Sequence, residues 1–542
     1  MESTKIFKDP IYGYVEVESD IVKNVIDTPV FQRLRRVVQT SYSPLYASAL
    51  HNRFIHSIGV YHLGKLCFNS IERDNPDIFK NNSPRLKNIF LLACLLHDVG
   101  HAPFSHTGER FYLNPLDDYS QLHNLLSSTV GTDEFMKDIP SGNKGANPHE
   151  IMSAIVGLKQ FSTLFQDSED RSFFARAITG YKYSDFSTDS DVKNCLIDLL
   201  NSSFIDVDKL DYLMRDSYMT GFASISIDYV RLLNSVCIHF EDESATIGYN
   251  KNAISVIENV VYARDIEKKW IQLHPSVLYE MYLLEKSLVC LFKDVNIIDK
   301  EGVVSKSLFS YEALIEKGVS LQKDVYINYL CDDDIVYLLK NKFKNNFFDE
   351  YLDRRKRRHP LWKSESEYKA SFLSRFNEEE RDSFDNSMKK LVQYIQKNGF
   401  DAINDDLITS IKKEIEENSD KTKYTEIPEK TKQLTIKQLE GYLNILEPLQ
   451  TFSYKYNIDF DYILLENKQF ISSFGKDDFE KIKILFKRND KIECRNFKSI
   501  SSFDAKKTLS TDFYYIYYKR KEPQQKFDLN ELFSEIRTRV SQ

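Results

Sequence analysis

The chain is poor in the residues that break helices and in those that build disulfide frameworks. Its 542 residues include only 17 glycines and 14 prolines, as in a mostly helical fold. The seven cysteines are scattered and odd in number, which argues for reduced thiols and a cytoplasmic location. No run approaches the ~20 apolar residues of a membrane helix, and the N-terminus lacks a secretory signal. We therefore expect no membrane partner, and the net charge of −8 argues against a protein built to coat nucleic acid.

Histidines gather in one short stretch of this chain. Uncharged residues 89–96 predict a buried helix that ends at the adjacent pair His97-Asp98, and His101 and His106 follow. Three of the eleven histidines thus lie within ten positions. Imidazole beside carboxylate is a ligand combination that divalent metals favour. A helix end with one buried, hydrogen-bonded histidine would explain the pair equally well if no further ligands existed.

Further ligand candidates lie on both sides of this stretch. His56 lies in residues 51–60, the start of a helical pattern that runs to about Phe68. Residues 206–216 carry four carboxylates among apolar residues, and Asp208, Tyr212 and Asp216 fall on one helix face. Buried charges of this kind are costly unless they are paired or metal-bound, although a solvated acidic stripe would look the same.

Two imidazoles and two carboxylates form a nitrogen–oxygen set that leaves coordination positions open. We predict that His56, His97, Asp98 and Asp208 bind a divalent ion, with Mn²⁺, Fe²⁺, Mg²⁺ and Zn²⁺ all open. An open position holds a water whose pKa the ion lowers. A closed structural zinc site would use mostly cysteine, and no cysteine flanks this set.

The order and spacing of these residues resemble the HD-domain metal phosphohydrolases. More narrowly, the chain is similar to their dNTP triphosphohydrolases, a branch that includes vertebrate enzymes with an added SAM domain and bacterial dGTPases. The resemblance covers roughly residues 5–290 in five blocks: 5–13, 27–35, 51–57, 97–106 and 206–216. It implies a mainly α fold, an HD-domain helical core with a smaller α+β C-terminal region. We expect no SAM domain ahead of the first block.

The resemblance also implies roles for residues around the metal. Arg53 and Lys209 would hold the triphosphate, which their charges suit. His106 and His149 would serve in proton transfer near the α-phosphate, with His101 and Glu150 as further candidates; each histidine is also explained as a packed core residue. The remaining substrate contacts would be Tyr212 under the deoxyribose, Asp216 near the 3′-hydroxyl, Gln39 close to the sugar, and Tyr282 in the helix 274–290.

A nucleotide-regulated assembly is a further implication of the resemblance. Residues matching Lys5, Asp27, Gln32 and Arg35 bind an activating nucleotide, GTP, dGTP or a dNTP, at a subunit interface of a homo-oligomer, a tetramer or higher. Asp27-Thr28-Pro29 also fits a simple helix N-cap, with Gln32 and Arg35 exposed. The basic cluster 354–360 has three interpretations: a solvated surface, part of an interface nucleotide site, or a contact for single-stranded nucleic acid.

The chain divides by composition into four predicted segments. These are an N-terminal regulatory and interface segment (1–50), the HD phosphohydrolase core (51–290), a helical extension (291–440) and a C-terminal α+β region (441–542). In the last segment, the aromatic run 512–520 predicts a strand, for which 482–487 is the candidate partner.

We therefore predict a metal-dependent hydrolase that converts a dNTP and water to deoxynucleoside and triphosphate. Nucleotide activation and antiviral or anti-phage defence by dNTP depletion are expectations that accompany it. The alternatives are another HD phosphohydrolase, such as a nuclease or a cyclic-nucleotide phosphodiesterase, and a nucleotide-sensing or nucleic-acid-binding protein. Arg53, Lys209, Tyr212 and Asp216 favour a free deoxynucleotide, because a nuclease does not need them.

Overall fold

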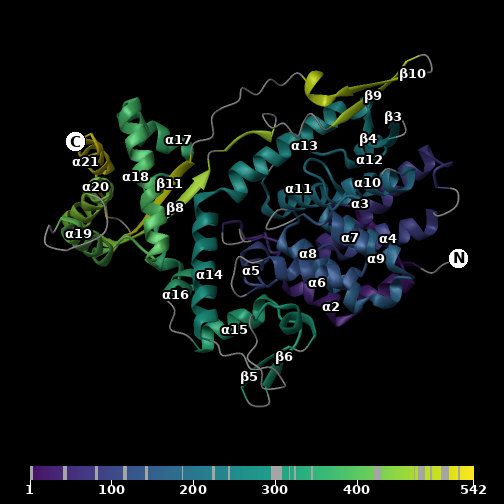
Figure 1. Ribbon diagram of the computed structural model, residues 1–542, viewed down its shortest axis with the longest axis horizontal. Coiled ribbons are helices and arrows are strands. Elements are labelled where there is room, and N and C mark those ends of the chain that lie inside the picture. Colours follow the sequence, from purple (N-terminus) through teal and green to yellow (C-terminus); the bar gives the residue numbers. More distant parts are fainter. Residues whose placement is uncertain are drawn as a thin grey trace. The chain divides into compact units, whose positions relative to one another are not determined.

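A computed structural model of the protein is mainly α-helical, as predicted, with four small sheets among its described residues (Figure 1). It forms two compact units: unit 1 comprises residues 1–272, 280–348 and 472–506, and unit 2 comprises 273–279, 349–471 and 507–542. None of the described helices is long and apolar enough to cross a membrane. The structure describes residues 4–541 except 41–44, 80–82, 114–118, 141–144, 186, 223–225, 242–243, 295–307, 317, 323–324, 343–345, 420–428, 469, 474–481, 489–490, 502–511 and 523–524.

Packed helices form the core of unit 1 (Figure 1). Helix α3 (Arg53–Asp74) packs between α4 (Ser83–Leu96) and α11 (Val207–Thr220), while α8 (Pro148–Gln160) and α9 (Ser168–Thr179) pack against each other and α4. The expected buried helix before His97 is present, since every residue of α4 from 89 to 96 is buried. Its last residue is Leu96, so His97 and Asp98 lie in the turn that follows.

Local sequence signals fix the ends of the helices that carry candidate site residues. The Asn52 side chain caps α3 by accepting a hydrogen bond from the Ile55 amide at 3.2 Å. Asp206 caps α11 in the same way through the Lys209 amide at 2.7 Å, and Gly221 ends that helix in the left-handed conformation. Pro148 occupies the first turn of α8, where a missing amide proton costs nothing.

The other helices and strands of unit 1 surround this core. They are β1 (Thr4–Asp9), β2 (Gly13–Glu18), α1 (Ser19–Ile21), α2 (Pro29–Gln32), α5 (His106–Glu109), α6 (Ser120–Val130), α7 (Asp133–Asp138), α10 (Thr188–Leu200), α12 (Tyr229–Leu233), β3 (Val236–Glu241), β4 (Ser244–Asn250), α13 (Ile254–Ile266), β5 (Val319–Gln322), β6 (Val325–Ile327), α15 (Asp332–Lys342), β9 (Lys483–Arg488) and β10 (Lys491–Asn496). Helices α14 (Pro275–Asp294) and α16 (Asn346–Leu352) contribute residues to both units. Strands β1 and β2 form an antiparallel hairpin, paired from Thr4 with Glu18 to Asp9 with Gly13.

Unit 2 combines helices with a three-stranded sheet. Its helices are α17 (Glu365–Glu367), α18 (Glu378–Lys397), α19 (Asp405–Ser419), α20 (Glu429–Tyr456) and α21 (Leu529–Val540), and its strands are β7 (His359–Pro360), β8 (Asp459–Lys468) and β11 (Asp512–Lys519). The predicted strand at 512–520 is therefore present. Its aromatic residues are buried because β11 is the central strand of the sheet, between β7 and β8.

The predicted pairing of strand 512–520 with 482–487 is wrong. Strand β9 instead pairs with β10, which follows it after two residues, and with β4 in the sheet β10-β9-β4-β3 of unit 1. The loop that joins β9 to β10 is much shorter than the one that would join β9 to β11, so its closure costs less entropy. The long aromatic strand β11 pairs with β8 from Asp512↔Lys468 onward.

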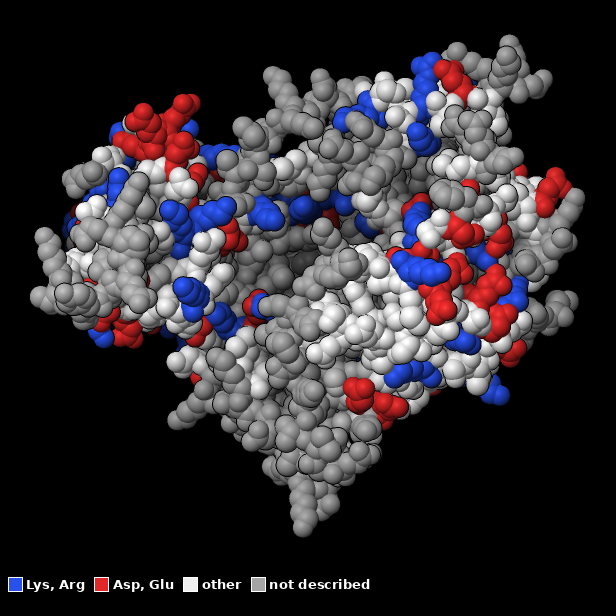
Figure 2. All heavy atoms as spheres, in the orientation of Figure 1, with Lys and Arg blue, Asp and Glu red and all other residues white. Residues whose placement is uncertain are grey.

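Charges of both signs are distributed over the surface. On the face shown in Figure 2, small groups of Lys and Arg alternate with groups of Asp and Glu among the described residues. In the basic cluster of unit 2, Arg355 pairs with Asp353 at 2.8 Å and is exposed, whereas Arg358 is largely buried against Glu350 at 2.9 Å. Arg358 thus contributes to the fold, and the three interpretations of the exposed part of the cluster stay predictions.

Candidate metal centre

Four predicted ligand side chains converge from three segments of unit 1. The Nε2 atoms of His56 on α3 and His97 after α4 lie 3.1 Å apart. Asp208 Oδ1 on α11 lies 3.0 Å from His56 Nε2 and 3.5 Å from His97 Nε2. Asp98 Oδ2 lies 3.4 Å and 3.5 Å from the same two nitrogens. Metal–ligand bonds of about 2.0–2.2 Å place neighbouring ligand atoms roughly 3–3.6 Å apart, so the ligand atoms of His56, His97 and Asp98 fit one ion, and Asp208 lies close to both imidazoles.

Hydrogen bonds on the far side of both imidazoles aim them at this point. His56 Nδ1 lies 2.7 Å from Asp211 Oδ2, and His97 Nδ1 lies 2.9 Å from the Cys94 carbonyl oxygen. Each acceptor holds a proton on Nδ1 and leaves Nε2 free to bind a metal, which is the usual arrangement around metal-binding histidines.

The electrostatics of the cluster favour a cation. Burial opposes the charges of Asp98 and Asp208, but Arg53 and His97 beside the first, and His56 and His97 beside the second, hold both pKa values well below the usual range. Burial opposes a proton on His56 as well, yet hydrogen bonds to Asp208 and Asp211 raise its pKa to about 10. A divalent ion supplies the positive charge that these carboxylates otherwise draw from a proton. The residues present therefore fit a metal.

The two predicted phosphate-binding cations differ in their surroundings. Arg53 is buried and all three of its nitrogens donate: Nη1 to Asp98 Oδ2 at 2.6 Å, Nε to Ser105 Oγ at 3.0 Å and Nη2 to the Gln39 carbonyl at 3.2 Å. Lys209 Nζ bonds to Asp206 Oδ2 at 2.6 Å and to the Ser202 carbonyl at 2.8 Å. Arg53 thus borders the candidate metal ligand Asp98, whereas Lys209 pairs with the cap of its own helix.

Three candidate proton donors form a second cluster next to the first. The rings of His101 and His149 stack with centroids 4.3 Å apart, and His106 meets His149 edge-on at 5.0 Å. His101 Nε2 lies 3.2 Å from Asp98 Oδ1, which joins the two clusters. The fourth candidate, Glu150, bonds to the Asn147 amide at 2.6 Å and caps α8.

One carboxylate, Glu109, contacts two histidines of this cluster. Its carboxylate lies 2.5 Å from His149 Nδ1 and 3.2 Å from His106 Nδ1. Burial opposes a proton on His149, but Glu109 outweighs it and raises the pKa. Burial and the charge of Arg53 instead hold the pKa of His101 well below its ordinary value. His149 therefore carries a proton more readily than His101.

Two of the predicted substrate contacts, Gln39 and Asp216, lie near a backbone bridge between Val38 and Asn52. Asp216 Oδ1 lies 2.6 Å from His51 Nε2, and both side chains are buried. Three buried polar atoms in this region have no hydrogen-bond partner within the described chain: Gln39 Oε1, Thr40 Oγ1 and His51 Nδ1. Tyr212 is half-buried on α11, two turns before the end of that helix. Tyr282 lies on α14 with its ring edge-on to Phe347.

The four predicted regulatory residues form two pairs in the N-terminal segment. Lys5 Nζ lies 3.7 Å from Asp27 Oδ2, and both side chains are about half exposed. Arg35 Nε donates to Gln32 Oε1 at 2.8 Å, while its guanidinium lies 3.6 Å above the Phe54 ring. Thr28 caps α2 through the Phe31 amide, and Pro29 follows it, as the N-cap interpretation of this stretch requires.

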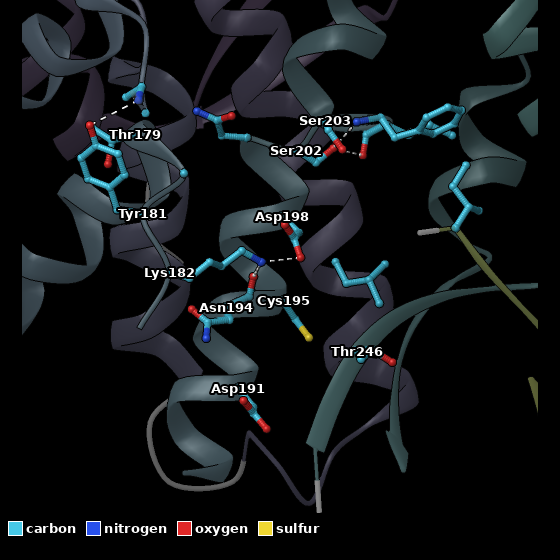
Figure 3. A pocket seen from close by; sticks show the side chains of 18 of the residues that line it. Thr179, Tyr181, Lys182, Asp191, Asn194, Cys195, Asp198, Ser202, Ser203 and Thr246 are labelled. Carbon is cyan, nitrogen blue, oxygen red and sulfur yellow. Dashed lines mark hydrogen bonds and ion pairs between the residues drawn. The ribbon is translucent and has the colours of Figure 1, made fainter. Parts of the chain in front are cut away.

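A separate cavity of about 880 Å³ lies between α10 and strand β4 (Figure 3). Lys182 and Asp198 form an ion pair at 2.5 Å in its wall. Among the predicted site residues, only Glu150 lines it. The candidate metal ligands do not line it.

Sequence reasoning missed three residues that organise these clusters. Asp211 orients His56, Glu109 joins His106 to His149, and His51 holds Asp216. Asp211 and His51 lie inside the blocks that resemble the family, so their position next to ligand residues was the available signal. Glu109 follows His106 by three residues, a spacing that brings side chains together on a helix.

Comparisons with known proteins agree with this geometry. The family model described as "HD domain" matches residues 53–142, and HD domains are metal-dependent. The chain is 25% identical over 363 residues to the uncharacterized protein YwfO of Bacillus subtilis, covering 65% of this chain and 73% of that protein. It is 33% identical over 236 residues to the deoxynucleoside triphosphate triphosphohydrolase SAMHD1 homolog of Dictyostelium discoideum, covering 43% of this chain.

That match spans only 39% of the Dictyostelium protein, less than two thirds of its length. The fold is similar over 99% of this chain to the crystal structure of a hypothetical protein from Aquifex aeolicus, all of which is covered, with a TM-score of 0.53 and 17% identity. Residues 53–142 therefore match an HD domain, and part of the chain is similar to a deoxynucleoside triphosphate triphosphohydrolase.

Proposed function

We propose that the protein is a metal-dependent dNTP triphosphohydrolase that releases deoxynucleoside and triphosphate. One observation carries the proposal: the four-residue metal centre and the Glu109 histidine cluster are joined through Asp98 and His101, whose atoms lie 3.2 Å apart. A hydrolase of this type needs an electrophilic centre for phosphate and an adjacent acid for the leaving group. The sequence similarity to a named dNTP triphosphohydrolase supports the nucleotide class.

In the proposed reaction, water attacks the α-phosphorus and the bond from that phosphorus to the 5′ oxygen breaks. When bound, a divalent ion would polarise a phosphoryl oxygen and acidify a water molecule. His149 suits the role of the acid that gives its proton to the departing 5′ oxygen, because Glu109 raises its pKa and fixes its ring. His106 shares the same carboxylate and is more exposed, so it suits proton exchange with solvent.

The region of the Val38–Asn52 bridge supports a sugar-bearing substrate. Buried polar atoms without partners are costly, and Gln39 Oε1 and His51 Nδ1 lie on residues whose backbones bond at 3.0 Å. A sugar hydroxyl would satisfy such atoms. Tyr212 on the neighbouring helix α11 supplies an apolar ring that would exclude a 2′-hydroxyl. The proposal therefore includes selection of deoxyribonucleotides over ribonucleotides.

Nucleotide activation and assembly remain parts of this proposal. The Lys5–Asp27 pair is half exposed, so its charges are accessible to a guanine base and a phosphate. Arg35 is exposed, and the face of its guanidinium that points away from Phe54 would be available for stacking on a purine. A homo-oligomer with an activator at its interface, and a role in defence by dNTP depletion, follow from the same resemblance.

The experiment follows the products of purified protein with Mn²⁺ or Mg²⁺. Each dNTP is supplied singly and in mixtures, with matched NTPs and single-stranded DNA as further substrates. We expect triphosphate and deoxynucleoside from dNTPs but not from NTPs or single-stranded DNA. Turnover that occurs only in dNTP mixtures would establish nucleotide activation. Cleavage of single-stranded DNA without triphosphate release under any mixture would overturn the proposal. The double variant His97→Ala/Asp98→Ala is expected to abolish turnover.

A further inference from the structure

The N-terminal hairpin reaches a metal ligand through one buried carboxylate. Tyr12, in the turn between β1 and β2, donates its hydroxyl to Asp211 Oδ1 at 2.6 Å. The other oxygen of Asp211 lies 2.7 Å from His56 Nδ1. His56 and Asp211 are fully buried. Tyr12, which lies 199 positions from Asp211 in the sequence, is therefore two hydrogen bonds from the imidazole of His56.

Arg215 and Asp9 hold this connection in place. Arg215 donates Nε to Asp211 Oδ2 and Nη2 to Asp211 Oδ1, both at 2.8 Å, and donates Nη1 to Asp9 Oδ2 at 3.0 Å. The other oxygen of Asp9 accepts from the amides of Ile11 at 2.8 Å and Tyr12 at 3.1 Å. Asp9 thus fixes the hairpin turn and binds the arginine at once. Bidentate pairs of this kind have little freedom to rotate.

The helices approach closely here only because position 59 is a glycine. A Cβ atom on Gly59 of α3 would lie 1.9 Å from Asp211 Oδ1 and 2.5 Å from Arg215 Nη2. Gly59 lies three residues after His56, and the absence of a side chain lets Asp211 of α11 reach His56. The surrounding backbone is therefore shaped for this network.

The charges of the network favour a fixed arrangement. Burial opposes the charge of Asp211, but Arg215 and the hydrogen bonds from His56 and Arg215 hold its pKa below the usual range. Burial and the charge of Asp211 raise the pKa of Tyr12 well above its ordinary value, so the phenol keeps its proton and donates it. Removal of the hydroxyl takes one donor from a buried carboxylate that must still hold His56.

We propose that Tyr12 is a positioning residue for the metal centre, through which the β1–β2 hairpin sets the affinity of His56 for the ion. The coupling is reciprocal, since a hairpin that strengthens metal binding is itself stabilised when the metal binds. This inference rests on the metal-binding part of the proposed function and is independent of the substrate.

The chain offers a matched control for Tyr12. Tyr61 is a buried tyrosine of α3, the helix of His56, and its hydroxyl donates to the carboxylate of Glu18 on β2. Tyr12→Phe and Tyr61→Phe therefore each remove one hydroxyl–carboxylate bond between the hairpin and the core. Only the first bond leads to a metal ligand.

The first experiment measures the Kd of Mn²⁺ for the full chain by calorimetry, without nucleotide. Removal of an outer-sphere partner typically weakens metal binding 10–100-fold, which we expect for Asp211→Asn. Tyr12 is one hydrogen bond further from His56 than Asp211 is, so we expect Tyr12→Phe to raise the Kd of Mn²⁺ about 3–10-fold. We expect Tyr61→Phe to change that Kd by less than about twofold. Equal Kd values for the two tyrosine variants would overturn the inference.

The second experiment measures amide hydrogen exchange of the hairpin, residues 4–18, with and without Mn²⁺. We expect Mn²⁺ to slow exchange in the wild-type protein and in Tyr61→Phe, and to have a smaller effect in Tyr12→Phe. Unchanged hairpin exchange on Mn²⁺ binding would refute the coupling even if a variant folded poorly. Failure of the protein to hydrolyse any dNTP would contradict the proposed function but leave both of these results intact.

Discussion

Arg53 Nη1 lies 2.6 Å from Asp98 Oδ2, the oxygen that also faces His56 Nε2 at 3.4 Å and His97 Nε2 at 3.5 Å. A guanidinium thus lies directly beside the metal position. It keeps Asp98 ionised at a site where burial alone would protonate it. In the proposed function, the same arginine would contact phosphate at the edge of this cluster.

Replacement of Arg53 by lysine tests how much the several hydrogen bonds of the guanidinium contribute to stability and turnover. Arg53→Lys keeps a charge near Asp98 but loses the bonds to Ser105 and the Gln39 carbonyl. We expect the free energy of unfolding to fall by about 1–3 kcal/mol and turnover of dNTPs to fall at least about tenfold. Chemical denaturation and steady-state kinetics measure the two effects. Arg36→Lys, at an exposed pair with Asp333, is the control, and equal effects of both changes would contradict this role.

The charge of Glu109 should set the alkaline limit of activity. Glu109 raises the pKa of His149, so Glu109→Gln lowers that pKa and reduces the protonated fraction at any given pH. If His149 donates the proton to the 5′ oxygen, the alkaline fall of kcat then moves to lower pH. A kcat–pH profile measures the shift. The control is Glu285→Gln, which removes a carboxylate bonded to Arg110 and should leave the kcat–pH profile unchanged. If the alkaline fall of kcat in Glu109→Gln occurs at the same pH as in the wild-type protein, His149 is not the acid.

A methyl group at position 59 should disrupt the contact between α3 and α11. The Cβ atom of Gly59→Ala would overlap Asp211 and Arg215, which are buried and cannot move into solvent. We expect a loss of about 3 kcal/mol or more in the free energy of unfolding, measured by denaturant titration. Gly441→Ala, where the nearest atom is Ser387 Oγ at 3.2 Å, should change stability by less than about 1 kcal/mol. Similar values for both variants would show that the close approach is not required.

Asp332 should make the stability of unit 1 depend on pH. Its carboxylate accepts from the amides of Val38 at 2.9 Å and Phe104 at 2.7 Å, and burial raises its pKa to about 7. The unfolded carboxyl has a pKa of about 3.9, so between about pH 4 and 7 the folded state binds a proton that the unfolded state has released. This contribution to stability is complete below about pH 4 and is lost as the pH rises through 7.

The variant Asp332→Asn isolates this effect because its amide does not titrate. Relative to the wild-type protein, the variant should gain stability when the pH rises from 5 to 8. Denaturant titrations of both proteins at the two pH values provide the measurement. A difference between variant and wild type that is the same at pH 5 and pH 8 would contradict the assignment.

Much of unit 1 was predictable because its signals are local. The uncharged run before His97 and the spacing of Asp208, Tyr212 and Asp216 predicted the helices that the structure shows. A cluster of His56, His97, Asp98 and Asp208 was predictable because histidine and aspartate are rarely placed together among apolar residues without a reason. Their convergence on one point depends on the packing of α3 against α4 and α11, which composition alone does not give.

Contacts between distant segments could not be predicted in the same way. The partner of the strand at 512–519 was wrong because an aromatic run shows that a strand is buried but not which strand lies beside it. The assignment of Lys209 to phosphate, made from its position next to Asp208 and from the resemblance, stays a prediction; its bond to Asp206 had no sequence signal of its own. Tyr12 shows no sequence signal for its bond to Asp211, since the two residues meet only in the folded protein.

The most direct test of the central claim is hydrolysis of a dNTP mixture in ¹⁸O-labelled water with Mn²⁺. If water attacks the α-phosphorus, one ¹⁸O atom enters the triphosphate and the deoxynucleoside remains unlabelled, as mass spectrometry of both products will show. The same reaction with excess chelator, or with His97→Ala/Asp98→Ala, should yield neither product. Label in the 5′-hydroxyl of the deoxynucleoside, or release of pyrophosphate or single phosphates in place of triphosphate, would contradict the account.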